Sequence, residues 1–460
     1  MSYEVLVEQQ RHYFASGVTH PYAFRIAQLK KLEQLLIRYT GEIESALKKD
    51  LHKLQFEAWA VEVGPAIQET RYAIRHLQKW MRNKRIRTPL LHFRAKSYIQ
   101  AIPHGNTLII APWNYPFLLS IRPLIGAIAG GNTAIIKPSE HAVHTSALLE
   151  QFINLNFASD YIHVIQADAQ GTSLLLREKF DFIFYTGGSM VGKIVYTAAA
   201  QHLTPVVLEL GGKNPCVIEP GVDLDTTVNR IVWGKFSNAG QTCVAPDYLL
   251  VHASIREQFT EKICARIQQQ FSENPESCVH FGRIINQHHT ERIQRLLAGE
   301  KCLLGGRVNI EERYIEPTVI DIQRLDSPIM QEEIFGPILP IITYHDAEEV
   351  LDIIQHHPNP LVFYVFSRDA DSIKRYATYV SCGDMVVNEV VLHFGHLSMP
   401  IGGKGPSGIG KYQGKSSFTA FTHPKSVMHR SFFPDLSIRY APYTDAGLRR
   451  IKQLFRYFYR

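Results

Sequence analysis

One cysteine of the sequence stands in a run of small and polar residues, NAGQTCVAP, at residues 238–246. The small neighbours Ala239, Gly240 and Thr242 leave the Cys243 thiol approachable, and the apolar, helix-like run VNRIVWGKF before it would fix its position. A thiol in such a setting can act as a nucleophile. A cysteine taken alone is more often a small buried apolar residue, so this segment leaves both interpretations open.

A carboxylate stands at the end of an apolar, strand-like run in VVLELGGKNP, residues 206–215. Burial there would raise the pKa of Glu209, as a general base that works near neutral pH requires. The alternative is a glutamate paired with a backbone amide, because a buried carboxylate is costly without a hydrogen bond. The run alone does not choose between these interpretations.

Glycines interrupt the segment FYTGGSMVGKIVYTAAA, residues 184–200, where a strand would end and a helix would begin. Such a turn directs backbone N–H groups and the positive end of the helix at one point, which favours a phosphate. The spacing from Gly187 to Gly192 departs from G-x-G-x-x-G, and Ile194 after Lys193 excludes a P-loop. A purely structural turn is therefore the alternative.

The elements that must position these residues follow an alternating pattern. The first ninety residues predict helices, because apolar residues recur at intervals of three and four. From about residue 106, the short apolar runs TLIIAP, TAIIKP, YIHVI, FIFYTG and VVLELGG alternate with helical patterns, and a second series follows residue 210. Such alternation is typical of parallel sheets with crossover helices, so we expect an α/β fold with two lobes that meet near residue 210.

Composition narrows the class of protein. The 460 residues are 45% hydrophobic and 20% charged, as in a globular chain of two or three domains. The net charge of +6 comes from scattered basic residues, so nucleic acid is not an expected partner. The six cysteines lie far apart without metal-ligand spacing, which indicates reduced thiols, a cytoplasmic location and no metal site. Neither the charged N-terminus nor the proline-broken apolar region 108–136 predicts an export signal or a membrane span.

Taken with APWNYPF, IIKPSE and MQEEIFGP, these segments resemble the motifs of the aldehyde dehydrogenase superfamily. The motifs occur in the family's order and approximate spacing, and the resemblance extends over nearly the whole chain, from FRIAQLKKL to GKSSFTAFTHPKS. The short N-terminus and the closing pattern GKYQGKSSFTAFTHPKSV are similar to those of class 3, the fatty aldehyde dehydrogenase type. The chain departs from the family at residues 401–405, IGGKG, where the family commonly has phenylalanine first and an apolar fourth residue.

The resemblance implies a reaction and three catalytic residues. Cys243 of the G-Q-x-C motif would attack the aldehyde carbon, with the oxyanion held by the side-chain amide of Asn114 and the backbone N–H of Cys243. The thiohemiacetal would give its hydride to the nicotinamide, and Glu209 would activate the water that hydrolyses the resulting thioester. A glutamate there favours a free carboxylic acid as product, since CoA-acylating relatives commonly lack it.

The resemblance also implies a cofactor and a substrate pocket. NAD is the expected cofactor, and NADP is expected as well, because class 3 members often accept both. Lys137 and Glu140 would contact the adenosine ribose, and Glu333 the nicotinamide ribose. Phe335 would pack beside the nicotinamide ring. The pyrophosphate contacts would be Gly187, Gly188, Ser189, Met190, Val191 and Gly192, and the expected pocket residues are Tyr115, Thr242, Val244, Asn388 and Ile401.

The implied architecture is the aldehyde dehydrogenase fold, with a Rossmann-like NAD-binding domain, a second α/β catalytic domain and a small strand-based oligomerisation extension. We expect the NAD-binding domain at residues 1–82 and 103–210, and the catalytic domain at residues 211–414. Residues 83–102 and 415–440 would bridge the subunits of a homodimer. Residues 441–460 would form a basic amphipathic tail.

The end of this tail, LRRIKQLFRYFYR, carries five basic residues and no acidic residue. Its apolar residues recur at helical spacing, so one face is apolar and the other is basic. Such a helix can lie on an anionic membrane surface without spanning it, or dock on its own body or on a second subunit. Membrane contact would suit long-chain aliphatic or polyene aldehydes.

The sequence leaves three candidate functions. The leading prediction is NAD(P)-dependent oxidation of long-chain or apolar aldehydes to carboxylic acids. A CoA-acylating or semialdehyde-specific dehydrogenase is the second, and a non-catalytic structural protein that retains the fold is the third. The presence of Asn114, Glu209 and Cys243 together argues against the third.

Overall fold

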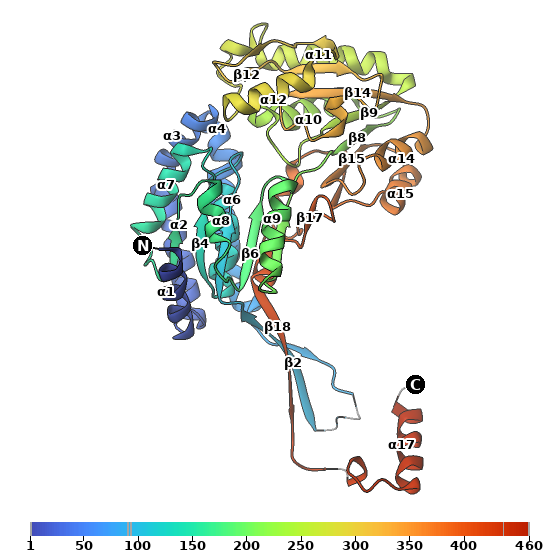
Figure 1. Ribbon diagram of the computed structural model, residues 1–460. Coiled ribbons are helices and arrows are strands. Elements are labelled where there is room, and N and C mark those ends of the chain that lie inside the picture. The colour runs from blue at the N-terminus through green and yellow to red at the C-terminus, as the bar shows by residue number, and fades with distance from the viewer. Residues whose placement is uncertain (1, 90–91, 93, 436, 459–460) are drawn as a thin grey trace.

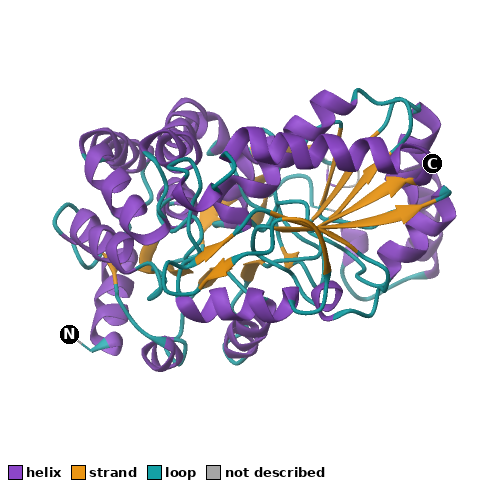
Figure 2. Ribbon diagram, turned by 90° about the horizontal axis from the view of Figure 1, so that it is seen from above, coloured by secondary structure: helices purple, strands orange, loops and turns teal. Residues whose placement is uncertain are grey.

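A computed structural model of the chain describes residues 2–89, 92, 94–435 and 437–458. Positions 90, 91, 93 and 436 of the predicted bridging segments and the last two residues of the predicted tail lie outside the described residues. Two sheets flanked by helices form the body, and a long strand pair leaves it as an arm (Figure 1). Seen from above, helices cover the strands on both sides (Figure 2), as expected of a parallel α/β fold.

The first sheet has six strands in the order β17-β7-β6-β3-β4-β5. The predicted apolar runs form its five parallel strands, and a short strand near the C-terminus joins the edge in antiparallel register. The strands are β3 (Asn106–Ile110), β4 (Thr133–Lys137), β5 (Ile162–Val164), β6 (Phe182–Thr186), β7 (Val206–Glu209) and β17 (Gly408–Ile409).

Successive strand residues point to opposite faces of this sheet, and each face has its own core. Ile109 and Ile136 pack with one helical layer, whereas Leu108 and Ile135 pack with the other. The first layer includes α2 (Tyr22–Arg38), α3 (Thr40–Leu51), α4 (Gln55–Ala58), a π-helical turn (Trp59–Val63), α5 (Gly64–Trp80), α6 (Leu118–Gly130) and α7 (Val143–Asn154). The second includes α1 (Tyr3–Ala15), α8 (Ala169–Leu175) and α9 (Ser189–Ala200).

The second sheet has seven strands in the order β10-β13-β14-β9-β8-β15-β16, all parallel except β10. The strands are β8 (Pro215–Ile218), β9 (Tyr248–His252), β10 (Lys301–Leu304), β13 (Thr318–Asp321), β14 (Ile338–Tyr344), β15 (Val362–Phe366) and β16 (Asp384–Val387). The helices of this lobe are α10 (Leu224–Phe236), α11 (Arg256–Phe271), α12 (Gln287–Leu297), α13 (Pro328–Gln331), α14 (Ala347–Gln355) and α15 (Ala370–Tyr379), beside a β11 (Val308–Asn309) and β12 (Tyr314–Ile315) hairpin.

The segment between the second lobe and the arm differs from the predicted boundaries. Ile401, Phe418 and Phe421 are buried in the core of the first lobe, because their apolar side chains pack beneath its sheet. Both β17 and α16 (Lys415–Ala420) therefore belong to the first lobe rather than to the catalytic domain or the bridge.

A three-stranded antiparallel sheet forms the arm, with β1 (Lys84–Ile86), β2 (Ala95–Pro103) and β18 (Thr422–Arg430). The chain then ends in α17 (Asp445–Phe458), which lies at the far end of the arm, away from both lobes (Figure 1). Within the described part of the chain, no helix combines the length and the apolar content that crossing a membrane requires.

The carboxyl ends of the parallel strands in the first lobe bring predicted site residues to one edge. Glu209 is the last residue of β7 and Lys137 the last residue of β4, while the glycine turn follows β6 directly. Ligands of open α/β sheets bind at this edge. The second lobe faces it and carries the loop with Cys243 (Figure 1).

Candidate active site

The loop that carries Cys243 reverses the chain sharply after α10. Asn238 and Ala239 have left-handed backbone angles, with φ of 53° and 51°, and Gly240 follows with φ of 76°. A Cβ atom on Gly240 would lie 2.2 Å from the carbonyl oxygen of Gly336. The glycine of this motif is therefore required by close backbone packing as well as by its own backbone conformation.

Buried amide side chains fix this loop from both sides. Gln241 donates from Nε2 to the carbonyl of Arg283 at 3.0 Å, and its Oε1 accepts from the N–H of Ile285 at 3.0 Å. Asn214 donates from Nδ2 to the carbonyl oxygen of Cys243 at 2.7 Å. The backbone of the candidate nucleophile is thus held by the interior of the second lobe.

The structure brings Asn114 of the first lobe to the same loop. Its side chain is 3% exposed, and Nδ2 donates to the carbonyl of Gln241 at 3.0 Å. The backbone carbonyl of Asn114 accepts from the Nδ2 of Asn238 at 2.9 Å and from the ammonium of Lys53 at 2.9 Å. Sequence motifs 129 positions apart (243 − 114) therefore meet, and a preorganised amide lies beside the loop of Cys243.

A buried ion pair supports this arrangement, and sequence reasoning missed it. Lys53 and Glu62 are both fully buried, with Nζ and Oε1 2.5 Å apart. The second oxygen of Glu62 accepts from the backbone N–H groups of Phe117 and Leu118, where α6 begins. Removing one partner would leave an uncompensated buried charge, which makes the pair a fixed brace between Asn114 and α6.

The Cys243 thiol is half-buried and lies near two carboxylates. Burial raises its pKa to about 12, with further contributions from Glu333 and Glu209, so the thiol is protonated at neutral pH. A nucleophilic thiolate at this position needs a nearby proton acceptor.

Glu209 has the properties of such an acceptor. It is 6% exposed, and its Oε1 has no hydrogen-bond partner within the described residues. Burial raises its pKa well above its usual range, Asp384 adds to this effect and Lys411 opposes it. The structure therefore lacks the backbone-amide pairing of Oε1 that the sequence left as an alternative.

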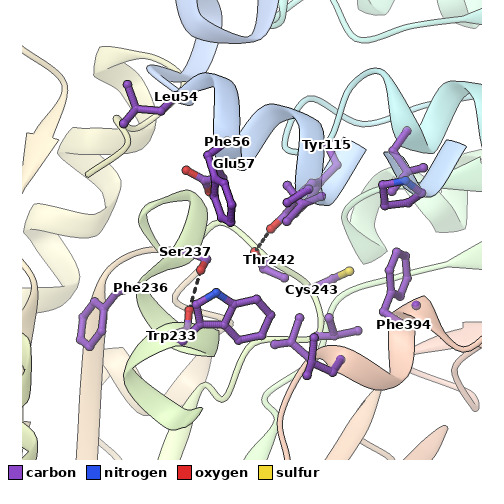
Figure 3. Close-up of a pocket in the computed structure, with 18 of the residues that line it drawn as sticks. Leu54, Phe56, Glu57, Tyr115, Trp233, Phe236, Ser237, Thr242, Cys243 and Phe394 are labelled. Atoms are coloured by element: carbon purple, nitrogen blue, oxygen red, sulfur yellow. Dashed lines mark hydrogen bonds between the residues drawn. The ribbon is translucent and has the colours of Figure 1, made fainter. Parts of the chain in front are cut away.

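An apolar cavity of about 490 Å³ opens onto Cys243. Figure 3 shows the thiol beside Thr242, Trp233 and Phe394, with the hydroxyls of Tyr115 and Thr242 hydrogen-bonded at 2.7 Å. The volume is typical of small-molecule sites. Its wall includes the predicted residues Tyr115, Thr242 and Val244, and most other lining residues are apolar: Leu54, Phe56, Ala60, Val61, Pro65, Leu118, Leu119, Trp233, Phe236, Phe271, Val391, Leu392 and Phe394.

Asn388 and Ile401, expected in the pocket, do not line this cavity. The Asn388 side chain exchanges hydrogen bonds with the backbone of Ser367, both at 2.9 Å, which closes the end of β15. Ile401 is 1% exposed and forms part of the core of the first lobe. The Asn388 side chain therefore stabilises the end of β15, and the Ile401 side chain fills the core of the first lobe.

The glycine turn presents an open helix N-terminus. Gly188 precedes α9 as its N-cap, and within the described residues the start of this helix has no side-chain cap hydrogen bond. A Cβ atom on Gly188 would meet nothing within 4 Å, whereas one on Gly187 would lie 2.3 Å from the Tyr185 hydroxyl. Gly192 is buried, and Gly188, Ser189, Met190 and Val191 are exposed. The uncapped N–H groups fit an anionic phosphate.

The other predicted cofactor residues lie at the same edge or facing it. Lys137 is 4% exposed and pairs with Glu140. Burial opposes ionisation of Glu140, yet the hydrogen bond from Lys137 lowers its pKa overall. Phe335 meets Trp113 edge-to-face at 5.2 Å between ring centres.

Glu333 completes this set from the second lobe. Burial and the neighbouring carboxylate of Asp247 together raise its pKa to about 8. A Cβ atom on Gly211 would lie 1.8 Å from its Oε2, so the ELGG motif needs glycine to make room for this carboxylate. With the uncapped helix, the carboxylates and the aromatic ring, the residues present fit a nicotinamide dinucleotide.

Comparison with known proteins gives the family. The aldehyde dehydrogenase family matches residues 4–427. The 4,4'-diaponeurosporen-aldehyde dehydrogenase of Staphylococcus aureus is 41% identical, over 98% of this chain and 99% of its own. Aldehyde dehydrogenase family 3 member H1 of Arabidopsis thaliana is also 41% identical, over 98% of this chain and 94% of its own. A substrate-bound structure of Staphylococcus aureus AldH matches with a TM-score of 0.96 at 41% identity, and covers 99% of this chain and 100% of that one.

The protein is therefore an NAD(P)-dependent oxidoreductase that oxidises aldehydes. The chain belongs to the aldehyde dehydrogenase family, and its similarity to family 3 members confirms the class 3 resemblance. The predicted fold class is confirmed as well.

Proposed function

We propose that this aldehyde dehydrogenase oxidises long-chain or otherwise apolar aldehydes, aliphatic or polyene, to free carboxylic acids. The observation that carries the proposal is the apolar cavity that opens onto Cys243, with the buried Glu209 carboxylate near the same thiol. The similarity to a relative named for a polyene aldehyde supports the same substrate class.

In this proposal Cys243 attacks the aldehyde carbon and its thiol proton passes to Glu209. The amide of Asn114 and the backbone N–H of Cys243 stabilise the oxyanion of the resulting thiohemiacetal. NAD(P), when bound, supplies the hydride acceptor. Glu209 releases the thiol proton to solvent before it acts again, and then takes a proton from the water that attacks the Cys243 thioester. Cleavage of the carbon–sulfur bond frees the carboxylic acid, and Glu209 returns the water proton to the departing thiolate.

The cofactor proposal is NAD, with NADP accepted as well. The uncapped α9 would hold the pyrophosphate through residues 187–192, and Phe335 would bound the nicotinamide side. Lys137 and Glu140 would contact the adenosine ribose, and Glu333 the second ribose diol. The ion pair between Lys137 and Glu140 gives this edge both a cation and an anion, which suits use of either cofactor.

The experiment that tests the substrate class is a series of linear aldehydes from butanal to hexadecanal, with succinate semialdehyde and benzaldehyde for comparison. We expect kcat/KM for NADH formation to rise about fourfold per added methylene until the cavity is filled, because each buried CH₂ contributes about 0.8 kcal/mol. The product should be the free acid even when CoA is added. A flat profile, a preference for the semialdehyde, or an acyl-CoA product would contradict the proposal.

We also propose a homodimer that works in the cytoplasm, where its thiols stay reduced. The arm of β1, β2 and β18 supports dimerisation, because it extends from the body (Figure 1). The apolar side chains of Phe432 and Phe433, which follow the end of β18, are exposed. The described part of α17 has basic residues on one side and the half-exposed Leu448 and Phe455 on the other. We assign this helix to peripheral contact with anionic lipid.

The tail proposal is tested with a chain that ends at Thr444. Removing α17 should lower binding to vesicles that contain anionic lipid and lower rates on long-chain aldehydes, while rates on short aldehydes stay the same. Binding to zwitterionic vesicles serves as the control. Unchanged vesicle binding with unchanged long-chain rates would overturn the lipid assignment, as would a loss of dimers in sedimentation without any change in vesicle binding.

A further inference from the structure

Arg122 is a buried cation in the wall of the apolar cavity. It lies on α6, is 1% exposed, and lines the cavity that also contains Cys243. A guanidinium in an apolar wall is costly unless its N–H groups are paired. The contacts of its N–H groups therefore show which of them can still donate a hydrogen bond to a ligand.

Three of its neighbours hold the guanidinium in place. Its Nε lies 2.6 Å from Oε2 of Glu69, and Nη1 donates to Oε1 of Gln413 at 3.0 Å. The guanidinium carbon stands 4.4 Å from the ring centre of Phe394, itself a cavity residue. Nη1 also donates to the carbonyl of Phe394 at 3.5 Å, whereas none of the hydrogen bonds within the described part of the chain involves Nη2. A guanidinium carries five N–H donors, so donor capacity remains at Nη2.

We propose that Arg122 is a specificity residue, which selects apolar aldehydes that carry an additional neutral oxygen acceptor, a ketone or hydroxyl oxygen, along their chain. The Nη2 group would donate a charge-assisted hydrogen bond to that oxygen while the aldehyde carbon lies at Cys243. This inference rests on the proposed role of the cavity as the aldehyde site.

The surrounding charges favour a neutral acceptor over an anionic one. Glu57 is half-buried in the wall of the cavity, and the carboxylates of Glu62 and Glu69 are buried where they pair with the cations Lys53 and Arg122. An anionic end group would bring a further negative charge into this low-dielectric region. A semialdehyde of a dicarboxylic acid is therefore a poor ligand for Arg122, and an oxo- or hydroxyaldehyde is a good one.

Arg122 also stabilises the structure around the cavity, through its partner Gln413. Gln413 donates from Nε2 to the carbonyls of His396 at 2.9 Å and Met399 at 3.3 Å, so the guanidinium is linked to the loop beside Phe394. A purely structural role would change the rates on all aldehydes together. The test must therefore compare two aldehydes of equal length.

The experiment measures kcat/KM for a linear aldehyde and for the same aldehyde with one methylene replaced by a ketone at successive positions. In the wild type, a ketone at one of these positions should raise kcat/KM about tenfold over that of the plain aldehyde, as one charge-assisted hydrogen bond allows. Arg122→Lys keeps a cation opposite Glu69 and should abolish that ratio, mainly through KM. The double variant Arg122→Met with Glu69→Gln should do the same without a buried charge.

Arg256→Lys is the matched control, because Arg256 pairs with Asp321 at 2.9 Å away from the cavity. It should keep the wild-type ratio. The inference is overturned when no ketone position exceeds the plain aldehyde in the wild type, or when the ratio persists in both Arg122 variants. A failure of this inference is distinguishable from a failure of the proposed function, because only the kcat/KM values of the plain aldehydes test the proposed function.

Discussion

Replacing Cys243 by alanine is expected to lower aldehyde-dependent NADH formation by roughly 10⁴-fold or more, because the variant has no atom that can form the covalent intermediate. The loop should keep its shape, since its anchors are Gln241, Asn214 and the close contact of Gly240 with Gly336 rather than the thiol. Cofactor affinity, measured by protein fluorescence, should therefore stay near that of the wild type.

The buried thiol itself provides a second measurement. Because burial and the carboxylates of Glu333 and Glu209 raise the pKa of Cys243 to about 12, the thiolate fraction grows with pH across the whole neutral range. Alkylation by iodoacetamide should accordingly accelerate with pH, and an aldehyde should protect the residue. Cys302→Ala is the control, since this exposed thiol lies on β10 in the second sheet. Steady-state turnover by Cys243→Ala would show that another group is the nucleophile.

The order of buried apolar runs was enough to predict the parallel sheets. Each run of the first lobe became a strand whose residues are all or nearly all buried, because a strand covered on both faces must be apolar at every position. The loops that carry Asn114 and Cys243 lie side by side, because the Asn114 amide donates to Gln241, two residues before Cys243. The role of Asn114 at the oxyanion stays a prediction.

What the sequence could not supply are pairings between distant, individually ordinary residues. Lys53 lies in the loop after α3 and Glu62 in the π-helical turn, and only the packing of these segments against the start of α6 buries the two charges together. Arg122 is similar, because its partners Glu69 and Gln413 come from opposite ends of the chain. No local pattern distinguishes a charge that will be buried and paired from one that stays in water.

Asn388 is a predicted pocket residue that does not line the cavity. A short polar residue after an apolar strand is equally suited to line a pocket or to close a turn, and the left-handed backbone at this residue, with φ of 57°, favours the turn. Its amide is consumed by the backbone of Ser367. Pocket residues are therefore predicted best where a motif also fixes the backbone, as it does at Thr242 and Val244.

Replacing Glu209 by glutamine should separate the two halves of the reaction. Loss of the general base is expected to slow thioester hydrolysis by about 10² to 10⁴-fold, whereas NADH formation in the first turnover should be less affected. Rapid mixing should then show a burst of NADH close to one equivalent per subunit, followed by a slow steady state. The amide is close in size to the carboxylate and carries no charge, so it should be tolerated at this buried site.

The pH dependence follows from the raised pKa of Glu209. Burial and the neighbouring Asp384 favour the protonated acid, so the fraction of ionised base in the wild type, and with it the hydrolysis rate, should rise with pH through the raised pKa. The Glu209→Gln variant should lose this rise. Glu333→Gln is the matched comparison, because it removes a different carboxylate near the same thiol and should weaken cofactor binding without producing a burst. A Glu209→Gln enzyme with wild-type steady-state rates and pH profile would assign water activation to another group.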